Sequence, residues 1–313
     1  MQIVALFGPT GVGKTAVAVH LARLLRARGE DPVAVSADAL QVYAGLETLT
    51  GVASAAERAE LEHRLLSFLP LDATFSVGQY ARLAHAQIDD LLAAGRRPLV
   101  VGGTGLYLRA ALTELSLRPP PPEGLRERLT AEMELRGAPA LHARLARRAP
   151  ASARTIDPND RQRIMRALEM LELGELPHAE LGGDGEGGGG GEDAQEESQL
   201  WSEDLRHPTL LAGLTMDREA LYGAIDARVE AMLAAGAREE VLRAHGAGAS
   251  ATARKALGFE ELLAGDVEAM KRHTRNYAKR QMTWMRKLAG VRVIDVTGRD
   301  AAAIAREILD CAA

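Results

Sequence analysis

Short apolar runs alternate with amphipathic stretches of helical length over the first third of the chain. The run at residues 3–7 predicts a buried strand, and the apolar spacing that follows predicts a helix. Residues 32–38 and 97–101 form two more apolar runs, with helical patterns expected at 55–66 and 77–94. This alternation of strands and helices predicts an α/β fold, with a parallel sheet flanked by helices.

The pattern changes in the middle of the chain. The alternation of strands and helices ends at the prolines of residues 119–122. Helical spacing resumes at 123–148, and a capped helix is expected to begin at Asn159-Asp160. Residues 182–199 consist largely of Gly, Glu and Asp, which predicts a disordered or flexible loop. We therefore expect a core made of residues 1–118 and 208–313, interrupted by a mainly helical insert at 119–207.

The last third predicts a return to the sheet. A strand is expected at residues 208–214, a helix capped by Asp217 through 234, and a long helix at 267–288. A final strand at 291–296 and a helix at 301–309 complete the pattern. Arg218 falls in the first turn of its helix, where a cation opposes the helix dipole, so an anionic partner is expected there.

The turn after the first strand carries the clearest chemistry. It reads Gly8-Pro9-Thr10-Gly11-Val12-Gly13-Lys14-Thr15, the G-x-x-x-x-G-K-T pattern of a P-loop between a strand and a helix. Glycines let successive N–H groups point at one anion at the helix N-terminus. Lys14 adds a positive charge, and the Thr15 hydroxyl suits Mg²⁺. The sequence therefore predicts binding of a di- or triphosphate with Mg²⁺.

Two further strands end in residues suited to this site. Asp38 follows the second strand, and ligands of open parallel sheets collect at the carboxyl ends of strands. A turn or N-cap aspartate is the alternative for Asp38. The next strand runs into Gly102-Gly103-Thr104, which suits close backbone approach to a ligand, although Thr104 could be a plain N-cap.

Charge is unevenly distributed. The formal net charge is −5, but residues 180–204 hold nine acids and no Lys or Arg, which leaves 38 basic and 34 acidic residues elsewhere, a balance of +4. Residues 271–287 hold seven Lys or Arg and no acid, and among them Arg275 and Lys279 share a side of the predicted helix. This favours nucleic-acid or phosphate contact over a solvated face.

The cysteine content and the hydropathy of the chain indicate the expected cellular compartment. Cys311 is the only cysteine, which excludes disulfides within the chain and is typical of a cytoplasmic protein. No apolar run is long enough to cross a bilayer, so we expect no membrane association.

Motifs spread over nearly the whole chain resemble those of the tRNA dimethylallyltransferase family. The matching stretches are residues 8–15, 37–43, 101–107, 159–169, 217–218, 255–259 and 277–284. The most specific are Gly102-Gly103-Thr104-Gly105-Leu106-Tyr107 and Ala278-Lys279-Arg280-Gln281-Met282-Thr283-Trp284. The chain departs from the family pattern at Ala39, usually serine, at Val52, usually lysine, and at Ser67, usually aspartate.

The resemblance implies a reaction and a set of partners. Dimethylallyl diphosphate would occupy the P-loop, held by Lys14, Thr15-bound Mg²⁺ and Arg218. The acceptor would be the exocyclic N6 amine of the adenosine 3′ to the anticodon, in tRNAs that read codons starting with U. Asp38 would act as general base and Thr104 would position the amine or Asp38. We expect a monomer that binds the anticodon stem-loop.

The resemblance also implies the tRNA-binding positions, some of which carry charge and some of which do not. They are Asp38, Ala39, Leu40, Gln41, Thr104, Arg126, Gln162, Arg163, Ile164, Met165, Arg166, Lys255, Gly258, Phe259, Arg275, Lys279 and Arg280.

Two other functions fit part of the sequence. A P-loop small-molecule kinase, with ATP in the loop and Asp38 activating a hydroxyl, explains residues 1–110 but gives the basic helix and the insert no task. A nucleotide-binding regulatory module without catalysis gives Asp38 no role. Preference for dimethylallyl diphosphate or ATP, with and without tRNA, separates these hypotheses.

Overall fold

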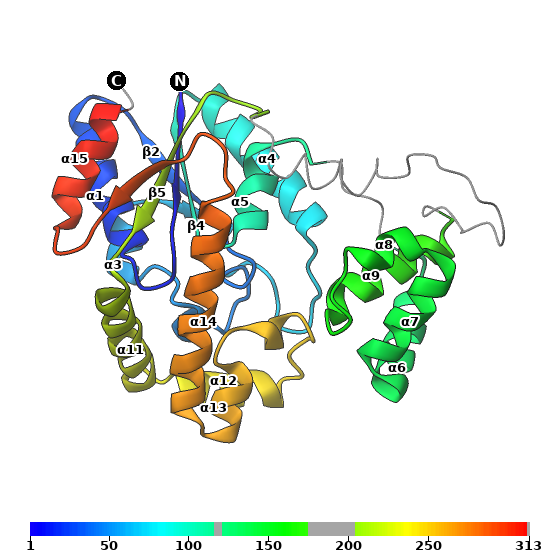
Figure 1. Cartoon of the computed structure of the whole chain (residues 1–313). Helices are drawn as coiled ribbons and strands as arrows, with labels where there is room; N and C mark the ends of the chain where they lie inside the picture. Colours follow the sequence, from blue (N-terminus) through cyan, green and yellow to red (C-terminus); the bar gives the residue numbers. More distant parts are fainter. Residues whose placement is uncertain (116–120, 175–203, 312–313) are drawn as a thin grey trace. The chain divides into compact units, whose positions relative to one another are not determined.

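A computed structural model of the chain describes residues 1–115, 121–174 and 204–311. It divides into two compact units, the first formed by residues 1–115 and 201–313 and the second by residues 116–200. The first unit holds the six strands, which are β1 (Ile3–Phe7), β2 (Pro32–Ser36), β3 (His63–Arg64), β4 (Arg97–Gly102), β5 (Thr209–Thr215) and β6 (Arg292–Asp295). All neighbours pair in parallel, in the order β3-β2-β4-β1-β5-β6, which confirms the expected fold class (Figure 1).

Helices cover both faces of this sheet. Those of the first unit are α1 (Lys14–Ala27), α2 (Glu47–Thr50), α3 (Ala55–Glu60), α4 (Val77–Ala93), α5 (Gly105–Leu112), α11 (Arg218–Ala234), α12 (Ala237–Gly246), the 3₁₀ helix η1 (Ala253–Lys255), α13 (Phe259–Ala264), α14 (Val267–Met285) and α15 (Ala301–Cys311).

Side chains of β1 alternate between the two layers, as the pleat of a strand requires. Val4 and Leu6 lie in a buried cluster with α1 and α15, whereas Ile3, Ala5 and Phe7 lie in a cluster with α4 and α5 (Figure 1). Because both faces are covered, β1 consists of five buried residues in succession. The end of α14 packs on the second layer through Met285.

The second unit is a small helical unit with its own core. It contains α6 (Leu125–Arg136), α7 (Ala138–Arg148), α8 (Pro150–Arg154) and α9 (Arg161–Glu172). Leu129, Leu141, Ile164 and Leu168 are buried together in its centre. The helical pattern expected at 123–148 is two helices, because Gly137 adopts a φ of 79° between them. The low-complexity stretch at 182–199 lies outside the described residues.

Most expected elements of the first unit are confirmed, with one correction at residues 55–66. The helix ends at Glu60, and His63-Arg64 pairs with Ala34 and Val35 of β2 as an edge strand. Buried Leu61 turns the chain into the extended conformation. A two-residue strand leaves too little alternation for its period to be recognised in the sequence.

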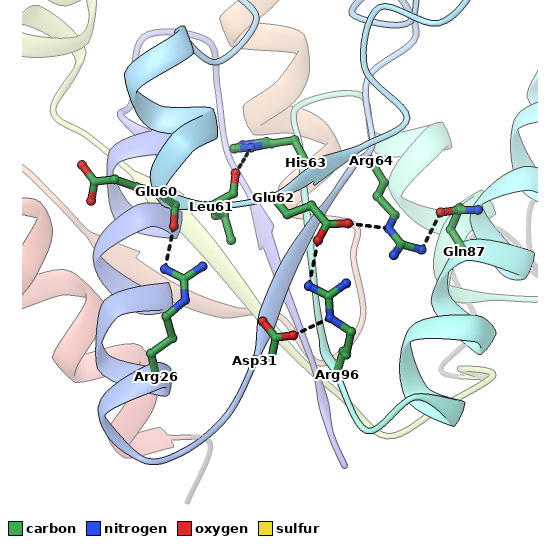
Figure 2. Close-up of polar contacts among 9 residues, drawn as sticks. All are labelled: Arg26, Asp31, Glu60, Leu61, Glu62, His63, Arg64, Gln87 and Arg96. Carbon is green, nitrogen blue, oxygen red and sulfur yellow. Dashed lines mark hydrogen bonds and ion pairs between the residues drawn. The ribbon is translucent and has the colours of Figure 1, made fainter.

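Polar contacts hold this edge strand in place. Arg96 lies between Asp31 and Glu62, with N–O distances of 2.5 and 2.7 Å, and Arg64 lies between Glu62 and Gln87 (Figure 2). Arg26 of α1 donates to the carbonyl of Glu60, where α3 ends (Figure 2). These contacts fix the amino ends of β2, β3 and β4. Within the described ranges, no helix is both long and apolar enough to cross a membrane.

Candidate active site

The P-loop connects β1 to α1, and its lysine is hydrogen-bonded to the main chain of the loop. Gly11 and Gly13 adopt φ values of 84° and 91°, which favour glycine, and α1 begins at Lys14. The Lys14 ammonium donates hydrogen bonds to the carbonyls of Gly8 and Pro9, both at 2.9 Å. Its positive charge is therefore held inside the loop, where a phosphate group would be bound.

Burial, together with the nearby charge of Arg228, lowers the pKa of Lys14 to about 8, although the charge of Asp38 opposes both effects. A lysine whose charged form is disfavoured by its surroundings gains most from an anion that restores it. The electrostatics of the loop thus favour a bound anion.

The carboxyl ends of β1, β4 and β2 bring three predicted segments together. Phe7 pairs with Gly102, and Val101 pairs with Ser36, so the P-loop, the glycine turn and Asp38 start from neighbouring strand ends. The Asp38 carboxylate accepts the amides of Leu40 at 2.9 Å and of Gln41 at 3.4 Å. Asp38 therefore also stabilises its own turn, and its charge raises the pKa of Tyr277 together with burial.

The glycines after β4 make room for protein rather than only for a ligand. A β-carbon at Gly102 would overlap the carbonyl of Ala37, one at Gly103 the amide of Gln281, and one at Gly105 the ring of Trp284. The sequence interpretation, close approach of a ligand, is thus incomplete, because α14 and the turn after β2 occupy this space.

Helix α14 binds the P-loop and the β4 turn through one side chain. The Gln281 carboxamide accepts the amide of Thr10 and donates to the carbonyl of Gly103, both at 2.8 Å. One helical turn earlier, the Tyr277 hydroxyl lies 3.3 Å from the Thr104 hydroxyl. Thr104 occupies the N-cap of α5 without a side-chain capping bond, so its hydroxyl is directed to Tyr277 instead.

Tyr277 and Gln281 belong to the matching stretch at 277–284, but neither is among the site residues expected from the sequence. A glutamine at a buried position was the available signal, since buried amides need two partners. Arg228 of α11 was missed as well. Nothing in the helical spacing distinguishes it from a solvated arginine, and only the fold reveals the charges around it.

Arg218 lies at the start of α11, where Asp217 caps the helix. Its Nε donates to the Tyr222 hydroxyl at 3.3 Å, and its guanidinium lies 5.4 Å from the Tyr222 ring. The same helix packs on the P-loop at another point, since Ile225 contacts Gly11. The predicted role of Arg218 at the diphosphate stays a prediction.

A small cavity of about 30 Å³ lies beside Thr15, lined also by Ser36, Gln41 and His63. The rest of its lining is apolar, from Ala18, Ala34, Ala53, Leu66 and Val101, and its volume suits water rather than an ion with a hydration shell. This cavity is therefore not the Mg²⁺ site, and the expected metal contact of the Thr15 hydroxyl, on the side of the P-loop, stays a prediction.

Gln41 is committed to the protein. Its Oε1 accepts from Ser36 at 3.2 Å, and its Nε2 donates to the carbonyls of Thr50 and Gly51, each at 3.2 Å. The turn Asp38-Ala39-Leu40-Gln41 is therefore held rigidly, and any tRNA contact of Gln41 requires breaking these bonds. Its position beside Asp38 agrees with the prediction, whereas its side chain is already satisfied.

Several predicted tRNA-binding side chains are buried or paired. Ile164 lies in the core of the second unit, and Phe259 lies in a core with α2, α12 and α13. Both side chains are therefore buried among other side chains. A β-carbon at Gly258 would overlap Met270. The tRNA contacts expected at these three positions stay predictions, and at Ile164 and Phe259 the side chains are occupied by core packing.

The remaining predicted positions of the second unit and of η1 are more accessible. Gln162, Arg163 and Lys255 are exposed and Met165 is half-buried. Arg126 makes two hydrogen bonds to buried Glu169, at 2.6 and 2.9 Å, and Arg166 also contacts Glu169 at 3.2 Å. These arginines remain candidate tRNA ligands, but they also neutralise a buried acid.

The positive charge of helix α14 is more nearly balanced by acids in the fold than its sequence suggests. Lys271 pairs with Glu230 and Glu268, and Arg275 pairs with Asp226 at 2.8 and 3.0 Å. Acids from α11 therefore face cations of a segment, residues 271–287, that contains no acid itself. Lys279 and Arg280 are exposed, with Arg280 placed over the Tyr277 ring at 5.5 Å. Tests of tRNA contact should begin with these two.

Comparisons with known proteins agree with the geometry. The family model described as IPP transferase matches residues 41–288. A tRNA dimethylallyltransferase of Kineococcus radiotolerans is 38% identical, over 99% of this chain and 96% of its own length. The structure of a full-length tRNA isopentenylpyrophosphate transferase from Bacillus halodurans superposes with a TM-score of 0.67 and 31% identity, covering 99% of this chain and 95% of that one.

A more distant likeness supports the fold alone. A eukaryotic dimethylallyltransferase acting on tRNA has a TM-score of 0.70 at 23% identity, covering 95% of this chain and 74% of its own. The full-length match at 38% identity and the family model over residues 41–288 decide the assignment. The chain belongs to the IPP transferase family, the family of the tRNA dimethylallyltransferases, and is a transferase.

Proposed function

We propose that the protein transfers a dimethylallyl group from dimethylallyl diphosphate to the N6 amine of the adenosine 3′ to the anticodon, in tRNAs that read codons starting with U. Membership of the family supports the reaction. The observation that carries its chemistry is the placement of Asp38 at the end of β2, which pairs with β4 and its Thr104 turn, while β4 pairs in turn with the P-loop strand β1. We place the enzyme, as a monomer, in the cytoplasm with its tRNA.

The diphosphate would bind over the P-loop amides. Lys14 would exchange its hydrogen bonds to the Gly8 and Pro9 carbonyls for bonds to phosphate oxygens. Thr15 would hold Mg²⁺ together with phosphate oxygens and water, and the ion would neutralise part of the diphosphate charge. Arg218, at the start of α11, would add a further cation.

The transfer forms a bond between N6 of adenine and C1 of the dimethylallyl group. The C1–O bond breaks, and its electron pair leaves with the diphosphate. Asp38 would accept the proton of the amine, a contribution of roughly 10²–10⁴ in rate. The Thr104 hydroxyl, held by Tyr277, would position the amine. The adenine must leave its stack to reach these groups, as bases of single-stranded loops can.

The test replaces Asp38 with asparagine. The amide oxygen of Asp38→Asn can still accept the Leu40 amide, so the turn persists while the base is lost. We expect single-turnover transfer to fall by about 10²-fold or more, with tRNA affinity unchanged. Asp31→Asn is the matched control, since Asp31 lies at the opposite end of the same strand, paired with Arg96. Transfer by Asp38→Asn within about threefold of wild type contradicts the general-base role.

The kinase hypothesis is tested with the same wild-type protein. Calorimetric titrations with dimethylallyl diphosphate and with ATP, in the presence and absence of tRNA, compare the two ligands directly. We expect transfer to tRNA with dimethylallyl diphosphate and no phosphoryl transfer from ATP.

A further inference from the structure

Arg228 is a cation inside the site for which the reaction as described has no use. It lies on α11, three residues after Ile225, and residues three apart share a helix face. Ile225 packs on Gly11 of the P-loop, so Arg228 belongs to the face of α11 that is turned toward the loop. The side chain is half-buried.

The other side of the guanidinium lies against the main chain after α2. A β-carbon at Gly51 would overlap the Arg228 guanidinium, and Gly51 itself has a φ of 61°. The Gly51 carbonyl accepts from Gln41, whose turn carries Asp38. Arg228 thus reaches from α11 to the segment that supports the predicted base.

Among the described residues, Arg228 is a cation without a direct partner of its own. Within residues 1–115, 121–174 and 204–311, no hydrogen bond or ion pair holds the guanidinium. Burial lowers the pKa of Arg228, because its charged form is partly removed from water, whereas the charges of Asp38 and Glu57 raise it. The charge of Arg228 in turn acts on Lys14, whose pKa burial also lowers. Lys14 and Arg228 are thus two neighbouring cations that are partly removed from water, and an anion bound between them would favour the charged form of both.

We propose that Arg228 is a further cationic ligand of the diphosphate, beyond Arg218, acting with Lys14 on its oxygens. The inference rests on the proposed function, since it assigns a residue to the diphosphate of that reaction. A planar guanidinium makes paired hydrogen bonds to phosphate oxygens, and a diphosphate carries enough charge to contact two cations and Mg²⁺. Arg228 binds the group in the substrate and in the released product alike.

The experiment measures binding of inorganic pyrophosphate with Mg²⁺ by calorimetry, without tRNA. Arg228→Met removes the charge and keeps much of the apolar stem. We expect its pyrophosphate affinity to fall by about 10- to 150-fold, the range for a hydrogen bond to a charged group. Arg228→Lys should recover part of the loss, because lysine keeps the charge but not the paired geometry. Arg238→Met, an exposed arginine of α12, is the control and should bind as wild type does.

Gly51→Ala provides a second test in which Arg228 is retained. The added methyl group displaces the guanidinium, so pyrophosphate affinity should fall while tRNA affinity stays unchanged. If Arg228→Met does not fold, as judged by circular dichroism, Gly51→Ala and Arg228→Lys test whether Arg228 binds the diphosphate.

The outcomes separate this inference from the proposed function. If wild type binds pyrophosphate and folded Arg228→Met or Arg228→Lys binds it equally well, the inference is wrong and the proposed function stands. A change confined to the pH profile of transfer would make Arg228 a partner of Asp38 instead, and would also overturn it. If wild type binds neither pyrophosphate nor dimethylallyl diphosphate, the proposed function itself fails.

Discussion

Replacing Gln281 with leucine should loosen the P-loop and destabilise the fold together. The Gln281 side chain is 4% exposed, and its carboxamide satisfies the Thr10 amide and the Gly103 carbonyl, each at 2.8 Å. Leucine has a similar volume but leaves the buried Gly103 carbonyl and the part-buried Thr10 amide without this partner. At about 1–3 kcal/mol for each unsatisfied group, unfolding should become about 2–6 kcal/mol easier.

Urea denaturation followed by circular dichroism measures the loss of stability. At roughly 2–4 °C for each kcal/mol, the melting temperature should fall by at least about 4 °C. Affinity for Mg²⁺-pyrophosphate should also fall, because the Thr10 amide is no longer held by α14 and the loop gains freedom that binding must remove. Asn276→Leu is the control, since Asn276 is exposed on the same helix.

Gln281→Glu distinguishes the two hydrogen bonds. Its carboxylate can accept from Thr10 but cannot donate to Gly103, whereas the protonated carboxyl can do both. The folded state therefore raises the pKa of this new glutamate, and its deficit in stability should grow as pH rises above the ordinary glutamate range. If Gln281→Leu keeps the stability and pyrophosphate affinity of Asn276→Leu, the reasoning about this bridge is refuted.

Two other predictions follow from charge. Because the pKa of Lys14 is about 8 in the free protein, binding of an anion should raise it, so pyrophosphate binding at pH 8.5 should take up protons and weaken at higher pH. Calorimetry in two buffers of different ionisation enthalpy measures this uptake, which should vanish in Lys14→Arg. For tRNA, Lys279→Gln should reduce the slope of log affinity against log salt by roughly one unit, since the exposed Lys279 can reach a phosphate. Arg275→Gln should change the slope less, because Arg275 already pairs with Asp226, and equal slopes in all three proteins would place the tRNA surface elsewhere.

The sequence predicted what is local in this fold. The P-loop is contiguous, from Gly8 to Thr15, and Asp38 directly follows an apolar strand, so motif and topology suffice to bring them together. The parallel sheet followed from apolar runs separated by helical patterns. The edge strand β3 did not, because two residues carry no period.

What the sequence missed depends on contacts between distant segments. Residues 271–287 contain no acid, yet Asp226 and Glu230 of α11 reach Arg275 and Lys271. The motif at 277–284 contains Gln281 but does not show what its amide binds. Likewise, motif matching gave Ile164 and Phe259 as tRNA positions, although packing buries both side chains.

The bridge through Gln281 also bears on how the protein is made. Thr10 and Gln281 are 271 residues apart in the chain. At about 5–20 residues per second, a ribosome needs roughly 14–54 s to synthesise the chain between them. Throughout that time the Thr10 amide of a nascent chain lacks its partner, and for most of it β1 also lacks β5 (Thr209–Thr215) as a neighbour. The P-loop is thus among the first segments synthesised and among the last to be completed, so a chain released before α14 carries the motif without its organised site.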